Sequence, residues 1–227
     1  MQPYFFPYVG YFQLMASVDT FVVFDDVNFI NRGWINRNRI NVNGAPHMIT
    51  VPLQQASQNR RICDIEVAND DAWRVRILRT IRQHYARAPQ YARTLPVVEH
   101  ILLHDAANLA DFLLHGLVTL RDHLRLKTNI VATSRRYENA DLKAQARIID
   151  IGLKERADVY VNPIGGQELY NPDDFAAAGL QLRFLTPGLA PYPSIRDAFV
   201  PALSIIDVLM CNDEASVAQM LSSATLS

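Results

Sequence analysis

The chain has 227 residues, of which 49% are hydrophobic and 20% are charged, and its formal net charge is −1 at pH 7. This composition is typical of a soluble globular protein, and the length suits one large domain with a sizeable core. Because the net charge is close to zero, no general positive field favours DNA, RNA or an anionic membrane as a partner.

The cysteines and the N-terminal residues indicate the expected compartment. Cys63 and Cys211 lie far apart and in no metal-ligand spacing, so a disulfide framework is not expected. The N-terminus lacks the basic region and aliphatic stretch of a signal peptide, and no apolar run approaches the roughly 18 residues of a membrane span. We therefore expect a reducing, cytoplasmic setting and no membrane span.

The N-terminal segment combines prolines, aromatic residues and polar side chains. Gln2–Pro7 is predicted to be the turn after a strand whose own residues are mostly missing, because proline lacks the N–H that a central strand needs. A short helix is expected over Tyr11–Ser17. Phe21–Phe24 is predicted to be a strand, since aromatic and β-branched residues are bounded there by polar ones.

A β-hairpin is predicted around Asn43-Gly44. Arg39–Val42 and Met48–Leu53 flank this pair. A type I′ turn needs φ > 0 at both central positions, which asparagine and glycine adopt readily. Ile62–Val67 is predicted to add another strand.

The middle of the chain is predicted to be helical. An arginine-rich segment carries apolar residues along one face, namely Trp73, Ile77, Leu78, Ile81 and Tyr85. A second amphipathic pattern runs from Leu109 to Leu124, and Pro89 and Pro96 are expected to break the stretch between the two. We interpret residues from about 70 to 125 as a helical insertion between two parts of an α/β core.

Strands and helices alternate in the C-terminal part of the chain. Strands are predicted at Asn129–Thr133, Val159–Val161 and Leu180–Leu185, and helices at Asp141–Glu155, Asp173–Ala178, Pro201–Met210 and Glu214–Leu221. In the first of these helices the residues expected to face inward are Leu142, Ala146, Ile149 and Leu153. Such alternation is typical of α/β proteins. We predict a single α/β domain over residues 1–227, with a mostly parallel sheet flanked by helices, a β-hairpin and the helical insertion.

Polar side chains follow every predicted strand. In open parallel sheets, ligands bind outside the carboxyl ends of the strands. The side chains expected to bind a substrate there, or in the loop before the hairpin, are Gln2, Tyr4, Tyr8, Asn28, Trp34, Asn36, Arg37, Asn38, Arg39, Ser134, Asn162, Gly165, Gly166 and Gln167. This mixture suits a pocket with an apolar wall and a few oriented polar groups.

Asp25 and Asp26 end the second predicted strand. They are candidates for a catalytic base or an amine-binding carboxylate. Adjacent residues of an extended backbone point in opposite directions, so only one of them needs to face the pocket. The alternative is that one carboxylate caps the next turn while the other is solvated.

Three further segments have both a functional and a structural interpretation. The tract Asn36–Arg39 contains two arginines that can grip phosphate or carboxylate, and its alternative is a surface loop leading into the hairpin. Gly165-Gly166 can let a ligand approach the backbone, and its alternative is a plain turn. Ser134, followed by two arginines, can contact a phosphate or begin a solvated helix.

The histidines and the missing motifs argue against a metal or a cofactor. His100 and His104 are one helical turn apart, but no further ligand pattern follows them. His47, beside the hairpin, is the histidine nearest the predicted site and is the third catalytic candidate. Cys63 has no positioned base, which favours a buried thiol. The sequence contains no P-loop, G-x-G-x-x-G or G-x-S-x-G motif, so we predict neither metal nor cofactor.

Five segments together resemble the WbqC-like protein family, namely Gln2–Phe12, Phe24–Phe29, Trp34–Ile40, Tyr160–Gly166 and Phe199–Asp207. They extend over nearly the whole chain. The resemblance implies a bacterial cytoplasmic protein encoded among surface-polysaccharide genes such as O-antigen clusters. For some members, transfer of an amino acid such as glycine onto a sugar has been suggested. Members carry a short hydrophobic strand before the Gln-Pro pair, which this sequence lacks.

The resemblance leads to the hypothesis of a transferase in O-antigen (lipopolysaccharide) biosynthesis. It would move an acyl or aminoacyl group from an activated donor onto an amino sugar that is linked to a nucleotide or a lipid. Asp25 or Asp26 would take the proton of the attacking amine. Arg37 and Arg39 would grip phosphate or carboxylate, and the amides of Asn36, Asn38 and Asn162 would orient the donor carbonyl.

Two alternatives stay open, as does the presence of a homo-oligomer. The sequence has no recognisable nucleophile or metal set, so the protein need not be an enzyme and can instead be a sugar-precursor binding or scaffold protein. A second, fainter resemblance is to ATP-dependent nucleotidyltransferases. Their opening motif is similar to Pro7–Tyr11, and their serine-rich motif is similar to Val131–Arg136. Tyr11 stands where that superfamily has a histidine, and a phenol cannot supply imidazolium charge.

Overall fold

The protein is described by a computed structural model that covers residues 1–195 and 199–227. The α-helices are α1 (Val9–Ala16), α2 (Ala72–Tyr85), α3 (Tyr91–Leu102), α4 (Leu109–His123), α5 (Ala144–Lys154), α6 (Pro172–Ala177), α7 (Ile205–Cys211) and α8 (Glu214–Leu221). The strands are β1 (Thr20–Val22), β2 (Arg37–Val42), β3 (Ala45–Thr50), β4 (Leu53–Gln54), β5 (Glu66–Val67), β6 (Asn129–Val131), β7 (Val159–Pro163), β8 (Gln181–Thr186) and β9 (Thr225–Leu226). Short 3₁₀ helices are η1 (Ile62–Asp64), η2 (Ser134–Tyr137) and η3 (Ile164–Leu169).

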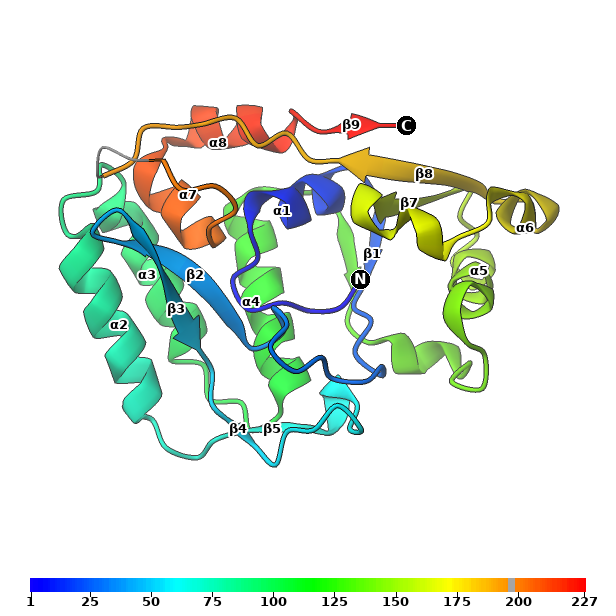
Figure 1. The fold of residues 1–227 in the computed structure, drawn as a ribbon, viewed down its shortest axis with the longest axis horizontal. Coiled ribbons are helices and arrows are strands. Elements are labelled where there is room, and N and C mark those ends of the chain that lie inside the picture. The colour runs from blue at the N-terminus through cyan, green and yellow to red at the C-terminus, as the bar shows by residue number, and fades with distance from the viewer. Residues whose placement is uncertain (196–198) are drawn as a thin grey trace.

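Helices and strands are mixed along the molecule (Figure 1). The helices α2, α3 and α4 lie with the β2–β3 hairpin on the left of this view, whereas α5, α6, β7 and β8 lie on the right. Within the described residues the strands form four small sheets. β1 pairs with β6 in parallel, and β7 with β8, while the other strand pairs are antiparallel. The structure therefore combines helices with two parallel strand pairs, and the expected single, mostly parallel sheet stays a prediction.

The N-terminal segment is part of the core. Phe5, Phe6, Tyr11 and Phe12 are at most 3% exposed, and the ring of Phe5 stacks on that of Phe112 in α4 with 6.1 Å between the centroids. Seven of the eight residues of α1 are buried, so this helix is central rather than amphipathic. Before it, the N-terminal amino group of Met1 donates to the Val22 carbonyl, and the Met1 carbonyl accepts from the Phe24 amide, which places Met1 beside β1.

The predicted hairpin is confirmed as β2 and β3. Asn43 and Gly44 have φ values of 54° and 84°, as a turn with two positive φ values requires, and Val42 pairs with Ala45. The second strand begins closer to the turn than predicted, because β3 covers Ala45–Thr50 and the expected range was Met48–Leu53. The expected strand over Ile62–Val67 was wrong in its first half, because Ile62–Asp64 forms η1, whose amides at Ile62 and Cys63 donate to the carbonyls of Val27 and Asp25.

Helices occupy most of the region between Ala72 and His123, as the apolar pattern predicts. The expectation that Pro96 breaks the chain was wrong, since α3 continues through it to Leu102. Proline removes one hydrogen bond from a helix interior. Here the buried side chains of Thr94, Val98 and Ile101 hold the helix on both sides of the proline, which offsets that cost.

The inward face of α5 differs from the prediction. Leu153 is 51% exposed and Ala146 is also exposed, whereas Arg147 and Ile151 are buried. The reason is electrostatic, because the guanidinium of Arg147 forms a salt bridge with Asp26 inside the protein. A buried ion pair therefore sets the rotation of this helix, and apolar periodicity alone predicted the wrong face.

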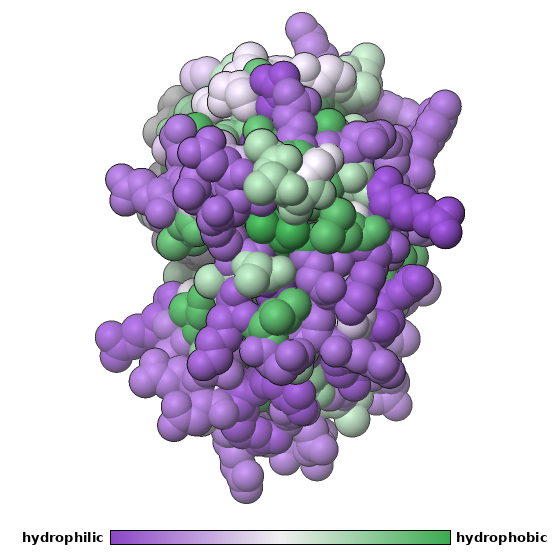
Figure 2. Space-filling model, turned by 90° about the vertical axis from the view of Figure 1, so that its right-hand side faces the viewer, coloured by the Kyte–Doolittle hydropathy of each residue, from purple (hydrophilic) through white to green (hydrophobic). Residues whose placement is uncertain are grey.

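The face that carries α5 and α6 has apolar side chains near its middle (Figure 2). The large exposed hydrophobic residues of this region are Leu153, Val159, Ile164 and Leu169. Ile164 and Leu169 bound the glycine loop that follows β7, so this loop lies among exposed apolar groups. No helix of the described ranges has the length and apolar character that crossing a bilayer requires.

Candidate functional site

The parallel strands β1 and β6 bring two polar segments together at their carboxyl ends. Beyond β1 the chain reaches Asp25 and Asp26, and beyond β6 it reaches Thr133 and Ser134. The carboxylate of Asp25 accepts from the Thr133 hydroxyl at 2.8 and 3.0 Å, from the Ser134 amide at 3.1 Å and from the Ser134 hydroxyl at 3.3 Å. The strand-end rule thus correctly predicted that Asp25 and Ser134 would be neighbours.

Asp26 has a different set of partners. Its carboxylate accepts from the Ser134 hydroxyl and from the guanidinium of Arg147. The Nε of Arg147 donates to the Asn139 side chain at 2.9 Å, and the guanidinium lies over the ring of Phe24, 4.8 Å from its centroid. Asp26, Arg147 and Asn139 are all less than 7% exposed, so the group forms a buried polar network rather than a solvated pocket wall.

These contacts limit what the two carboxylates can do chemically. A carboxylate accepts roughly four hydrogen bonds. Three donor groups already face Asp25, namely the Thr133 hydroxyl, the Ser134 amide and the Ser134 hydroxyl, which is shared with Asp26, and Arg135 lies 3.7 Å away at its edge. Asp25 is 1% exposed and Ser134 is completely buried. In this arrangement the two acids tie β1, β6 and α5 together, while a role as proton acceptor stays a prediction.

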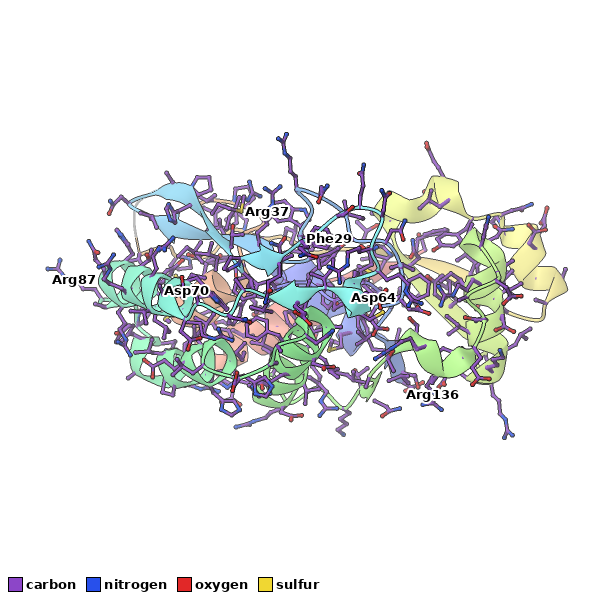
Figure 3. The ribbon with its side chains drawn as sticks, turned by 90° about the horizontal axis from the view of Figure 1, so that it is seen from below. Phe29, Arg37, Asp64, Asp70, Arg87 and Arg136 are labelled. Atoms are coloured by element: carbon purple, nitrogen blue, oxygen red, sulfur yellow. The ribbon has the colours of Figure 1, made fainter. Side chains whose placement is uncertain are left out.

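Most of the Asn/Arg tract supports the loop in front of the hairpin. The amide of Asn36 donates to the Val51 carbonyl at 2.8 Å, and Arg37 donates to the carbonyls of Gly33 and Arg32. In Figure 3 Arg37 lies over the β2–β3 hairpin, while Arg136 of η2 lies on the other side of the molecule. The side chains of Asn36 and Arg37 thus bond to backbone carbonyls near the hairpin, and a single site that joins this tract with the twin acids stays a prediction.

Asn38 fixes the aromatic loop to the hairpin. Its side-chain amide donates to the carbonyls of Phe5 and Phe6, at 3.1 and 2.8 Å. Phe6 has a φ of 43°, an uncommon conformation for a bulky residue, and these two hydrogen bonds hold the backbone around it. The amide of Phe5 in turn donates to the carbonyls of Trp34 and Ile35.

Arg39 is the member of the tract whose side chain faces a surface rather than the loop. Its guanidinium lies over the ring of Trp34, 5.2 Å from the centroid, and Arg39 pairs with Met48 across the hairpin. Trp34 and Met48 are each 40% exposed. The Nε of Arg39 is buried and has no hydrogen-bond partner among residues 1–195 and 199–227. We call Trp34, Arg39 and Met48 the Trp–Arg surface.

The Gln2–Tyr8 loop lies next to this surface. Tyr8 and Arg39 both bond to the segment at Ser204, through a bridge from Tyr8 and a 2.8 Å hydrogen bond to the Arg39 carbonyl. Gln2 accepts from the buried Tyr11 hydroxyl at 2.9 Å, and Tyr4 packs on the Tyr11 ring. Burial raises the pKa of Tyr4 and of Tyr8, so both phenols are protonated hydrogen-bond donors at neutral pH.

Gly10 makes room for the ring of Tyr8. A Cβ at this position would lie 2.5 to 2.6 Å from the end of the Tyr8 ring, which packs over the first turn of α1. The φ of Gly10 is ordinary, so a side chain at this position would act by displacing the end of the Tyr8 ring.

The remaining predicted residues lie elsewhere. The amide of Asn162 donates to the Pro163 carbonyl, and its oxygen accepts from Tyr160 at 3.2 Å. Asn162 lies in β7, whereas Gly165, Gly166 and Gln167 belong to η3 directly after it, where Gly165 has open space around it. Asn28 is exposed and forms a bridge with Arg61, and His47 is exposed on β3 opposite Ile40. Their proposed roles stay predictions.

Several polar residues of the interior were not identified from the sequence. Asp207 of α7 is 2% exposed and accepts from Tyr85 at 2.7 Å and from Tyr192 at 2.6 Å. Burial raises the pKa of Asp207 and of both phenols. Arg147 and Asn139 were missed as well, because their partners are remote in the sequence and nothing local marks them as buried.

The titratable side chains provide no grouped metal ligands. Among the described residues, no three histidine, cysteine or acidic side chains are arranged to hold a metal ion. His104 stacks on His115 with the ring centroids 3.7 Å apart, and burial lowers the pKa of His115. Stacked imidazole rings do not point their nitrogens at one common centre.

Comparison with known proteins supports one relationship over nearly the whole chain. The chain is 28% identical over 212 residues to the uncharacterized protein Rv1507c of Mycobacterium tuberculosis, and the match covers 92% of this chain and 90% of that protein. No solved structure gives a significant match. The model of the WbqC-like protein family matches residues 2–219. The chain therefore belongs to the WbqC-like protein family.

Proposed function

We propose that this protein binds a phosphate-bearing amino sugar at the Trp–Arg surface and acts as a transferase in bacterial surface-polysaccharide (O-antigen) biosynthesis. It moves an acyl or aminoacyl group, with glycine as the leading candidate, onto the sugar amine. The observation that carries the binding step is the buried Nε of Arg39, which lacks a partner among the described residues. An unpaired buried N–H costs about 1–3 kcal/mol, so a ligand oxygen at this atom gains a favourable interaction.

The surroundings of Arg39 suit a sugar phosphate. A guanidinium grips phosphate oxygens through two parallel N–H groups. Trp34, half exposed beside it, offers an aromatic face on which an apolar side of a sugar ring or a base can pack. Tyr4 and Tyr8 hold protonated phenols in the adjoining loop, ready to donate to hydroxyl or carbonyl oxygens.

The transfer step needs no covalent enzyme intermediate. The sugar amine attacks the carbonyl carbon of an activated donor, a C–N bond forms, and the leaving group departs with the electron pair of the broken bond. The amine proton passes to the leaving group or to water. Donors that face the carbonyl oxygen stabilise the charge that develops there, and the phenols of Tyr4 and Tyr8 are our candidates for this role.

A binding protein without turnover is the second candidate. It is favoured by the twin acids, because Asp25 and Asp26 are buried and already accept hydrogen bonds from Thr133, Ser134 and Arg147. Such a protein would hold the sugar precursor for another enzyme at the same Trp–Arg surface. The two candidates share the binding step and differ only in whether product forms.

Titration calorimetry and product detection test the proposal together. UDP-glucosamine is the first sugar, and glycine donors activated as a thioester or an adenylate are added for product detection by mass spectrometry. Arg39→Gln is expected to weaken sugar binding about tenfold, the effect of losing one charge-assisted hydrogen bond. Arg79→Gln on the exposed face of α2 is the matched control.

The outcomes separate the hypotheses. Equal affinity for the Arg39 and Arg79 variants would remove the Trp–Arg surface from the proposal. Binding that depends on Arg39 without product from any donor would favour the binding protein. Product whose rate falls in the Arg39 variant supports the transferase.

A further inference from the structure

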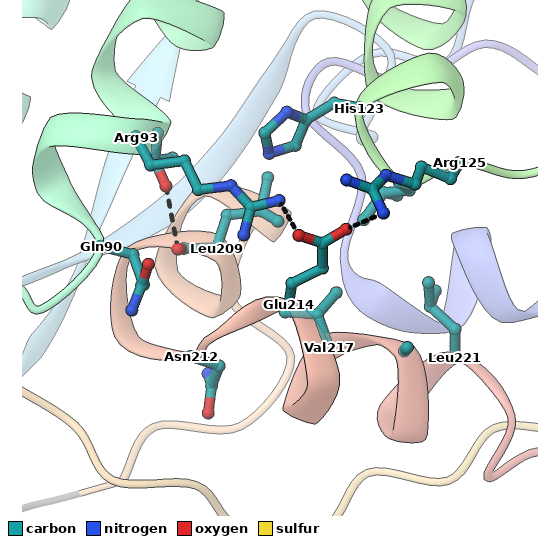
Figure 4. Close-up of a pocket in the computed structure, with 12 residues that line it drawn as sticks. Gln90, Arg93, His123, Arg125, Leu209, Asn212, Glu214, Val217 and Leu221 are labelled. Atoms are coloured by element: carbon teal, nitrogen blue, oxygen red, sulfur yellow. Dashed lines mark hydrogen bonds and ion pairs between the residues drawn. The ribbon is translucent and has the colours of Figure 1, made fainter.

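A cavity of about 290 Å³ opens between α3, the end of α4, α7 and α8 (Figure 4). It is distinct from the residues discussed above, since no side chain of the Trp–Arg surface or of the twin-acid network lines it. Ligand pockets typically enclose about 300–1,000 Å³. This cavity is at the lower end, so it suits a small molecule.

One wall of the cavity is apolar. Leu209 of α7 and Val217 and Leu221 of α8 line it, and each is at most 7% exposed. The side chain of Ala218, which is exposed, lies at the opening. An apolar wall of this size accommodates a short hydrocarbon group and excludes water from it.

The rim carries two arginines that converge on one carboxylate. Arg93 donates to one oxygen of Glu214 at 2.8 Å, and Arg125 lies 2.7 Å from the other oxygen (Figure 4). His123 lies between them, and its pKa is lowered by burial and by Arg93, so it is neutral at pH 7. Two guanidinium charges against one carboxylate leave one positive charge uncompensated at the rim.

The carboxylate of Glu214 occupies the position between the two arginines, and a ligand can displace it. Its carboxylate takes one oxygen to each guanidinium, which demonstrates that the two arginines are spaced for a carboxylate. The Glu214 side chain is 44% exposed, and ion pairs at such positions contribute little to stability. A ligand carboxylate can therefore replace it while Glu214 turns to solvent, and the ligand gains the apolar wall in addition.

We propose that this cavity is a second binding site, for a small monocarboxylate with a short apolar chain. The acid group binds Arg93 and Arg125 at the place that Glu214 now occupies, and the chain packs against Leu209, Val217 and Leu221. This inference is independent of the proposed transferase activity, so either can fail without the other.

Hexanoate is the probe, and hexanol, which has the same chain without the charge, is the matched compound. Titration calorimetry on the full chain is expected to show saturable binding of hexanoate and at least about tenfold weaker binding of hexanol, because the charge-assisted hydrogen bonds are lost. Arg93→Gln and Arg125→Gln each weaken hexanoate binding. Glu214→Gln strengthens it severalfold, since the internal competitor has lost its charge. Arg79→Gln leaves it unchanged.

A further variant tests the cavity itself. Ala218→Leu fills the opening from an exposed position and is expected to weaken hexanoate binding while the melting temperature stays close to that of the wild type. The proposal is overturned by the absence of saturable hexanoate binding or by equal affinities for hexanoate and hexanol. An unchanged affinity in both arginine variants, with circular dichroism showing folded protein, also overturns it.

Discussion

The guanidinium of Arg147 on α5 is hydrogen bonded to the carboxylate of Asp26, which lies 121 residues earlier in the chain, and both side chains are almost completely buried. This pair joins α5 to the end of β1. It also explains why α5 turns Arg147 inward and leaves Leu153 exposed. A buried charge that loses its partner destabilises the folded protein. Replacing either residue alone should therefore lower the free energy of unfolding, which tests the pair.

Arg147→Met and Asp26→Asn are each expected to lower the free energy of unfolding by about 3–5 kcal/mol, because each leaves the other side chain buried without its partner. The double variant should recover much of this loss, since no uncompensated charge remains. Urea unfolding of the four proteins measures the coupling. Additive losses in the double variant would contradict the assignment.

Asp25→Asn distinguishes an architectural acid from a catalytic one. The asparagine amide cannot accept all of the hydrogen bonds from Thr133 and Ser134, so we expect a loss of about 1–3 kcal/mol in unfolding free energy. Sugar binding at the Trp–Arg surface should be unchanged. Normal stability combined with a complete loss of turnover would instead restore Asp25 as the proton acceptor.

Gly10→Ala is expected to disturb ligand binding more than folding. The new Cβ would lie 2.5 to 2.6 Å from the tip of the Tyr8 ring, and a ring tip at the surface can turn away at small cost. The displaced phenol then no longer faces a ligand. Calorimetry should show weaker sugar binding than in the wild type, with little change in melting temperature. If Tyr8→Ala binds as the wild type does, Tyr8 is not part of the site.

Asp207 should make the stability depend on pH. Burial raises its pKa in the folded protein above the ordinary value of 3.8. Between these two pKa values the folded state binds more protons than the unfolded state, so the contribution of Asp207 to stability grows as the pH falls and is lost as the pH rises through the folded value. The difference in unfolding free energy between the wild type and Asp207→Asn should therefore shift in favour of the wild type from about pH 7 to about pH 4.5. A constant difference would contradict this.

The two thiols should be inert in the native protein. Burial raises the pKa of Cys63 to about 11 and that of Cys211 to about 12. Only the thiolate reacts, and at pH 8 roughly one Cys63 thiol in a thousand is ionised. Iodoacetamide should label neither cysteine without denaturant and both in urea, as read by mass spectrometry. Rapid native labelling of Cys63 would place it in a more open environment.

Local patterns predicted the parts of the fold that neighbours along the chain determine. The Asn43-Gly44 pair specified the hairpin turn through its backbone preference, and the apolar spacing of α2 and α4 specified their helices. Pro96 inside α3 could not be predicted in this way, because burial of its neighbours overrides the local cost. The face of α5 was missed for a similar reason, since it is set by a partner 121 residues away.

One contact between the candidate site residues could be predicted from the sequence, whereas most of their hydrogen-bond partners could not. The strand-end rule brought Asp25 and Ser134 together, as expected from parallel pairing of β1 and β6. It could not reveal that these groups would satisfy one another, nor that Asn36, Arg37 and Asn38 would be used on backbone carbonyls. Arg93 of α3, Arg125 just after α4 and Glu214 of α8 are far apart in the sequence, and only the folded chain shows that they meet.

Ser204 has a consequence for how the protein can be shortened. Its amide donates to the Arg39 carbonyl, and the amide of Ile205 donates to the Pro7 carbonyl. Ser204 and Ile205 therefore connect the hairpin to the aromatic loop. Proteolytic cleavage upstream of Ser204 would leave Trp34 and Arg39 in the N-terminal fragment. It would nevertheless release the two hydrogen bonds that hold the hairpin and the aromatic loop together. The position of the aromatic loop beside the hairpin therefore depends on Ser204 and Ile205, which are far away in the sequence.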